Sequence, residues 1–211
     1  MFKLCCVTHR GLCAGDLPQR VGELCRGGID RVILREKDLT EEEYEVLARQ
    51  VVEAGGEAVV LHHFPGVCTR LGVPRLHLSL GELEACPQLR DQVELLGVSV
   101  HAPAEAVRAQ ALGADYATAG HVFDTDCKKG LPGRGLAFLA SVCAAVTIPV
   151  YAIGGIGPDN LAAVAQTGAA GACLMSGLMT CPHPAEMVRH LRERLPCAFP
   201  HQPPLAWRPG R

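Results

Sequence analysis

The segment from residue 120 to residue 135 holds a dense set of side chains that could do chemistry. It contains four glycines, three cations, two acids and one histidine, between an apolar run at 116–119 and a helical pattern at 136–146. Connections in compact domains usually span about 2–6 residues, so a loop of this length is typical of a functional segment rather than a plain linker. His121 directly follows the apolar run, and an imidazole can exchange protons near neutral pH. The pattern therefore predicts His121 as an acid–base residue.

Two cations follow the apolar run at 31–34, which reads as a strand. Arg35 and Lys37 are two residues apart, so their side chains are expected to point to the same face if the strand geometry continues that far. A guanidinium binds a carboxylate or phosphate through two hydrogen bonds, and an ammonium adds a point charge. The pair is predicted to bind an anion; a surface ion-pair cluster with Glu36 and Asp38 is the alternative.

Glycines and small polar residues end the last two apolar runs of the chain, at 150–153 and 171–175. The pair Gly154-Gly155 lets backbone approach a ligand closely, and its N–H groups, with those of Ser176-Gly177, can form an anion-binding concavity. In a barrel this is a frequent phosphate site, so we expect a phosphate here. The alternative is a tight turn before a helix.

The elements that must position these residues alternate between strand and helix patterns. The third and fourth connections look short, and the adjacent His62 and His63 are expected to point to opposite faces of their strand. Helical patterns cover 17–25, 40–54, 104–112, 136–146, 161–166 and 185–195. Strands are predicted near 2–7, 31–34, 58–61, 75–78, 95–99, 116–119, 150–153 and 171–175. Eight strands in this order predict a single (β/α)₈ TIM barrel over residues 1–195, with a flavodoxin-like sheet as the alternative and residues 196–211 as a Pro-rich extension.

Composition narrows the class of protein. The chain has 211 residues, 48% of them hydrophobic, and a formal net charge of −2. This balance gives no sign of a nucleic-acid surface, and no apolar run approaches the roughly 20 residues of a membrane span. The eleven cysteines form no CxxC pair and no zinc-type spacing, which argues against a disulfide scaffold or a structural metal site. We expect a cytoplasmic protein that binds neither nucleic acid nor membrane.

Several motifs together resemble the thiamine-phosphate synthase superfamily, over nearly the whole chain up to about residue 195. Within it, the segment 120–130 resembles the TenI branch, whose activity is aromatisation of a thiazole intermediate of thiamine biosynthesis. The resemblance rests on the segments 32–38, 97–101, 120–135, 152–156 and 175–177.

The resemblance implies a cofactor-free and metal-free thiazole tautomerase. Its substrate would be 2-(2-carboxy-4-methylthiazol-5(2H)-ylidene)ethyl phosphate, and His121 would move the proton that makes the ring aromatic. Other residues would bind this small phosphorylated molecule: Arg35, Lys37, Ser99, Thr125, Lys128, Gly154, Gly155, Ser176 and Gly177. Synthases carry an Asn-Asp pair where this chain has His62-His63 and a Gln-x-Asp segment where it has Leu80-Gly81-Glu82, so the magnesium-binding acids are missing at those places.

Two alternatives to the tautomerase stay open. One is a Mg²⁺-dependent thiamine-phosphate synthase, which joins an aminopyrimidine pyrophosphate to a thiazole phosphate. The other is a non-catalytic barrel that binds a thiamine intermediate and has a regulatory role. The sequence also leaves open whether the barrel forms a homodimer.

Overall fold

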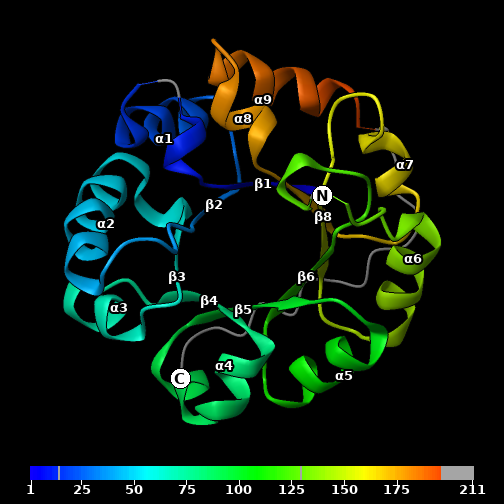
Figure 1. Ribbon diagram of the computed structural model, residues 1–211, viewed down its shortest axis with the longest axis horizontal. Coiled ribbons are helices and arrows are strands. Elements are labelled where there is room, and N and C mark those ends of the chain that lie inside the picture. The colour runs from blue at the N-terminus through cyan, green and yellow to red at the C-terminus, as the bar shows by residue number, and fades with distance from the viewer. Residues whose placement is uncertain (14, 129, 196–211) are drawn as a thin grey trace.

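The chain forms a closed barrel of parallel strands surrounded by helices (Figure 1). The structure is a computed structural model and describes residues 1–13, 15–128 and 130–195. Each strand pairs in parallel with the next, and β8 closes the ring by pairing with β1. The strands are β1 (Lys3–Val7), β2 (Arg31–Leu34), β3 (Val59–His62), β4 (Arg75–Ser79), β5 (Leu95–Val100), β6 (Tyr116–Gly120), β7 (Val150–Ile153) and β8 (Gly171–Leu174). The predicted (β/α)₈ barrel is confirmed, and the flavodoxin-like alternative is wrong.

The helices lie outside the ring of strands, with α1 beside α2 and α9 beside α1 (Figure 1). They are α1 (Leu17–Arg26), α2 (Glu41–Gly55), α3 (Pro65–Leu71), α4 (Leu80–Ala85), α5 (Pro103–Ala111), α6 (Gly135–Ala145), α7 (Leu161–Ala165), α8 (Ser176–Thr180) and α9 (Pro184–Glu193). The sequence pattern did not predict α3, α4 or α8, which are short. Within the described residues, no helix is both long and apolar enough to cross a lipid bilayer.

Capping boxes fix the starts of two helices. At the start of α2, the Thr40 hydroxyl accepts a hydrogen bond from Glu43 N (3.3 Å), and the Glu43 carboxylate accepts one from Thr40 N (2.9 Å), a pairing that the Thr-x-x-Glu spacing in the sequence indicates. Ser79 and Glu82 make the same reciprocal pair at the start of α4. Each box satisfies backbone donors that a helix start leaves without partners. The Ser79–Glu82 box was not predicted from the sequence, although its Ser-x-x-Glu spacing is that of a capping box.

The apolar core has two parts. The larger one fills the space between the strands and the helices. The smaller one fills the inside of the barrel and consists of Cys5, Val7, Ile33, Val60, Tyr116, Tyr151 and Cys173. Because strand residues alternate between faces, the positions two residues beyond Ile33 and Val60 also face the inside, at the carboxyl ends of their strands. These positions hold Arg35 and His62.

The predicted Pro-rich extension, residues 196–211, lies outside the described residues. The domain boundary after residue 195 therefore stays a prediction.

Candidate active site

Arg35 and Lys37 lie at the carboxyl end of β2, and neither has an acidic partner within the part of the chain that the structure describes. The neighbouring acids are taken by Arg10, whose guanidinium lies 3.4 Å from a Glu36 carboxylate oxygen and 2.6 Å from an Asp38 carboxylate oxygen. Between residues 1 and 195, leaving aside residues 14 and 129, no ion pair involves Arg35 or Lys37. The alternative of a surface ion-pair cluster with Glu36 and Asp38 is thus wrong, and two cations remain available to an anion.

Thr8, just beyond β1, positions the backbone of Arg35. Its hydroxyl donates a hydrogen bond to Glu36 Oε1 (2.6 Å) and accepts one from Arg35 N (2.9 Å). Thr8 and Glu36 are both buried, so these bonds are shielded from water and cost more to lose than surface ones. The start of the Arg35 side chain is therefore held at a fixed place beside the barrel mouth.

A buried polar network crosses the barrel interior between β3 and β6. The two ring nitrogens of His77 contact the Tyr116 hydroxyl (3.0 Å) and the Ser99 hydroxyl (2.9 Å). Thr118 donates to Ser99 Oγ (3.2 Å). The His62 ring stacks on the His77 ring, with 5.8 Å between centroids and 22° between planes. Ser99, which was predicted to bind substrate, thus has a structural partner in this network.

Both interior imidazoles are held in the neutral state. Burial lowers the pKa of His62 to about 3, and the nearby His77, Lys37 and Arg35 act in the same direction while Glu82 opposes them. Burial likewise lowers the pKa of His77 to about 3, helped by the charges of Arg35 and Lys37. These electrostatic effects place both cations near the two rings. The carboxyl ends of β2, β3 and β4 therefore combine positive charge with neutral hydrogen-bonding groups.

His63 is exposed whereas its neighbour His62 is buried, which agrees with the expectation that they lie on opposite faces of the strand. His63 adopts a positive φ of 74° and contacts the Glu82 carboxylate through Nδ1. The other Glu82 oxygen accepts hydrogen bonds from Ser79 N and Ser79 Oγ, both at 2.6 Å. The carboxylate nearest this part of the mouth is therefore already fully engaged.

These donors do not fit the magnesium site that the family implies. Magnesium prefers carboxylate, carbonyl and water oxygens in octahedral geometry, whereas this edge offers two imidazoles and an engaged carboxylate. Across the described ranges, no group of three or more His, Cys, Asp or Glu side chains could hold a metal ion. His62 and His63, which stand where the resemblance places the Asn-Asp pair of synthases, supply imidazoles in place of oxygen ligands.

The loop after β6 packs along the end of β7. Phe123 N donates to Gly154 O (3.1 Å). Gly154 and Gly155 both have positive φ, 103° and 64°. A Cβ on Gly154 would overlap the backbone and Cβ of His121, and one on Gly155 would overlap Phe123. The glycine pair is therefore needed for this close approach, and its predicted role in phosphate binding stays a prediction.

The remaining predicted residues lie around the same end of the barrel. His121 Nε2 is 3.2 Å from Leu131 O, within its own loop. Thr125 is half-buried, and Lys128 is exposed in a 3₁₀ turn, Asp126–Lys128. Ser176 and Gly177 are exposed at the start of α8.

The predicted site residues thus form two groups at the carboxyl ends of the strands, one after β2 to β5 and the other after β6 to β8. Arg35, Lys37 and Ser99 surround the buried histidine pair, whereas His121 packs with Gly154 and Gly155. Where the structure describes the chain, no hydrogen bond or ion pair joins the first group directly to the second. A ligand that used both groups would have to span the mouth.

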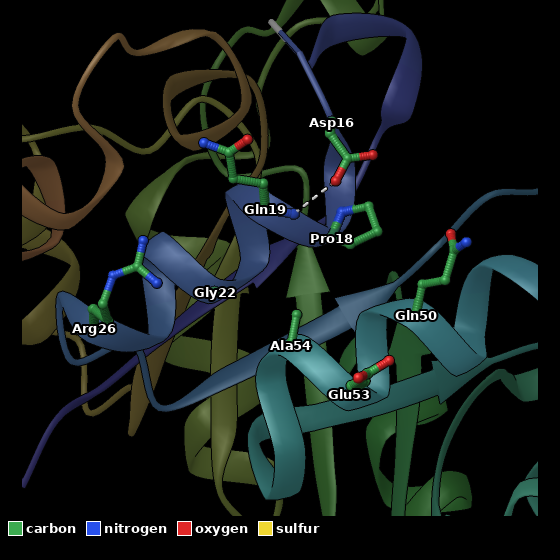
Figure 2. A pocket seen from close by; sticks show the side chains of 8 residues that line it. All are labelled: Asp16, Pro18, Gln19, Gly22, Arg26, Gln50, Glu53 and Ala54. Atoms are coloured by element: carbon green, nitrogen blue, oxygen red, sulfur yellow. Dashed lines mark hydrogen bonds between the residues drawn. The ribbon is translucent and has the colours of Figure 1, made fainter.

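A separate groove of about 520 Å³ lies on the outer surface between α1 and α2 (Figure 2). Its lining residues are Asp16, Pro18, Gln19, Gly22, Arg26, Gln50, Glu53 and Ala54. None of them belongs to the predicted site. Because barrel enzymes place their chemistry at the carboxyl ends of the strands, this groove is not the candidate active site.

Known proteins resemble this chain over most of its length. The thiamine monophosphate synthase family model matches residues 4–178. A thiamine-phosphate synthase from Syntrophomonas wolfei is 32% identical over 199 residues, covering 91% of this chain and 95% of that protein. One from Thermus thermophilus is 34% identical over 175 residues, covering 80% and 84%. The structure of a thiamine phosphate pyrophosphorylase from Pyrococcus furiosus matches with a TM-score of 0.77 and 28% identity, covering 92% and 95%.

These relatives correct the predicted function. Both curated relatives are thiamine-phosphate synthases, so the predicted thiazole tautomerase is wrong, and the isomerase class and the proton shuttle assigned to His121 are withdrawn with it. The match favours the first alternative raised from the sequence. The chain belongs to the thiamine monophosphate synthase family of enzymes.

Proposed function

We propose that this protein is a thiamine-phosphate synthase, which joins an aminopyrimidine pyrophosphate to a thiazole phosphate and releases pyrophosphate. The observation that carries the proposal is the pair Arg35 and Lys37, which directly follow β2 and have no acidic partners among the described residues. Two unneutralised cations suit the most highly charged part of the substrates, the pyrophosphate. The identity to synthases over most of the chain supports the same reaction.

The other side of the mouth takes the thiazole phosphate in this proposal. Backbone N–H groups around Gly154, Gly155, Ser176 and Gly177 would bind its phosphate, because turns with positive φ can aim successive amides at an anion. Thr125 and Lys128 would close over the reactants from the β6–α6 loop. His121, at the root of that loop, would contact the substrate between the two anionic ends.

A second candidate is a barrel that binds these phosphorylated compounds without joining them. The donor set favours it, since the residues at the places of the synthase acids do not suit magnesium. The test is to incubate the purified protein with both synthase substrates, with and without Mg²⁺, and to follow thiamine phosphate by chromatography. Product above the buffer rate supports the synthase. Binding of thiazole phosphate without product supports the second candidate.

Arg35→Gln is expected to lower kcat/KM for thiamine phosphate formation by about 10- to 100-fold, since a hydrogen bond to a charged group contributes about 1.5–3 kcal/mol. The measurement is a steady-state assay in which the pyrophosphate substrate is varied. Arg49→Gln is the matched control, because Arg49 is exposed on α2 and pairs only with Glu45 among the described residues. Equal activity of the two variants would contradict the role of Arg35.

A further inference from the structure

The hydrogen-bond network around His77 lies mostly out of reach of water. It consists of the His77 ring and the hydroxyls of Tyr116, Thr118 and Ser99. His77, Tyr116 and Thr118 are 2%, 4% and 3% exposed, whereas Ser99 is partly exposed. Buried donors nearly always find an acceptor, because an unmade hydrogen bond costs free energy. The three buried members are therefore expected to place all their hydrogens within the network.

The Tyr116 hydroxyl decides which nitrogen of the His77 ring carries the hydrogen. Among the residues that the structure describes, its one hydrogen-bond partner is His77 Nδ1, 3.0 Å away. The phenolic O–H therefore donates to Nδ1, because in the opposite arrangement its hydrogen would be buried without an acceptor. Burial keeps the ring neutral, so it has a single N–H. Since Nδ1 accepts, that hydrogen lies on Nε2.

The Ser99 oxygen accepts the bonds that the rest of the network donates. His77 Nε2 lies 2.9 Å from Ser99 Oγ, and the Thr118 hydroxyl donates to the same atom over 3.2 Å. With a hydrogen on Nε2, Thr118 has no acceptor other than Ser99 in the described part of the chain. A hydroxyl oxygen has two lone pairs, and both are then used. The O–H of Ser99 is left without an acceptor inside the network.

Ser99 is also the member of the network nearest the barrel mouth. It lies two residues closer to the carboxyl end of β5 than Gly97, which pairs with His77. We propose that His77 is a positioning residue that, together with Tyr116, turns the Ser99 hydroxyl into a fixed hydrogen-bond donor toward the barrel mouth. The hydroxyl meets an acceptor atom of the substrate, an oxygen or an unprotonated nitrogen, and disfavours a group that can only donate. The choice of the aminopyrimidine pyrophosphate as this substrate rests on the proposed function; the direction of the hydroxyl rests on the network.

Nitrogen NMR of the His77 ring tests the network without any ligand. The full-length protein is labelled with ¹⁵N-histidine and measured at pH 7, and the His77 signals are identified from a His77→Gln sample. We expect the hydrogen on Nε2 and none on Nδ1. A hydrogen on Nδ1 would overturn the proposal, because Nε2 would then accept from Ser99 and turn its hydroxyl away from the mouth.

A double-mutant cycle tests whether His77 acts through Ser99. The measured quantity is the Kd of the aminopyrimidine pyrophosphate alone, by calorimetry on variants whose folding is checked by circular dichroism. His77→Leu and Ser99→Ala are each expected to weaken binding about 5- to 10-fold, and the double variant no more than Ser99→Ala alone. His77→Gln keeps a side-chain N–H donor and is expected to stay within about 3-fold of wild type. Effects that multiply in the double variant would mean a purely structural role for His77 and would overturn the proposal.

Tyr151→Phe is the matched control for removing a polar group from the barrel interior. Tyr151 stacks on Tyr116, and its hydroxyl makes no hydrogen bond to any described residue. This variant is expected to bind as wild type does. The proposal also fails if Ser99→Ala binds within about 2-fold of wild type, or if wild type does not bind the aminopyrimidine pyrophosphate. Turnover with thiazole phosphate is read separately, so binding that depends on Ser99 and His77 without turnover would defeat the proposed function but keep the positioning role.

Discussion

Lowering the pH from 7 to 5 is expected to reduce the free energy of unfolding by about 4 kcal/mol, through His62 and His77 together. The pKa of each ring is about 3 in the folded protein, whereas the model value is 6.5. Below pH 6.5 the two histidines bind protons in the unfolded chain but stay neutral in the folded protein. The free energy of unfolding therefore falls as the pH falls toward 3. Each histidine contributes about 2 kcal/mol of this loss between pH 7 and 5. Carboxylates contribute little there, because they bind protons in an unfolded chain only near pH 4.

Urea denaturation at pH 7, 6 and 5 measures this loss, and two variants assign it. His62→Asn removes one of the two rings and is expected to reduce the loss to about half. His190→Asn removes an exposed histidine of α9 and is expected to leave the loss unchanged. A wild-type protein equally stable at pH 7 and 5 would show that the interior rings are not held neutral.

The barrel could be predicted because its signals are local. Each strand is a short apolar run and most helices have an apolar period or a cap, as the Thr40–Glu43 box shows for α2. The short helices α3, α4 and α8 have five to seven residues each. This is too short for a periodic pattern to stand out, and the Ser-x-x-Glu spacing of Ser79 and Glu82 is the one local signal that could have found the start of α4.

The site was harder to predict, because it depends on contacts between strands. Side-chain parity placed Arg35 and Lys37 at the mouth, but only the structure shows that Arg10 takes the neighbouring acids. The stacking of His62 on His77 joins residues of two strands, and no spacing in the sequence reports it. The predicted reaction, thiazole tautomerisation, was wrong because it relied on a single local motif. The motif around His121 indicates the chemistry of one loop, whereas the similarity of the whole chain indicates the synthases.

Gly97→Ala is expected to lower the free energy of unfolding by about 4 kcal/mol, because Gly97 lies beneath the hydrogen bond between His77 and Tyr116. Gly97 pairs with His77 of β4 on one side and with Tyr116 of β6 on the other. The Tyr116 hydroxyl reaches across β5 to His77 Nδ1, 3.0 Å away. A Cβ at residue 97 would overlap both side chains. Overpacking costs about 1–3 kcal/mol, and breaking a buried hydrogen bond adds about 1–3 kcal/mol.

Chemical denaturation of four variants, Gly97→Ala, Gly81→Ala, Tyr116→Ala and the double variant at residues 97 and 116, separates this mechanism from a general intolerance of the glycine. Gly81→Ala is the control, because a Cβ at that position of α4 meets no atom within 4 Å; it is expected to be neutral or to stabilise by up to about 1 kcal/mol. A Tyr116→Ala background leaves only the His77 ring above residue 97, so Gly97→Ala is expected to cost less than half as much there. Equal costs in the two backgrounds would mean that the strain does not come from the Tyr116 ring. The contact between the Tyr116 hydroxyl and His77 would then not be the reason that residue 97 must lack a side chain.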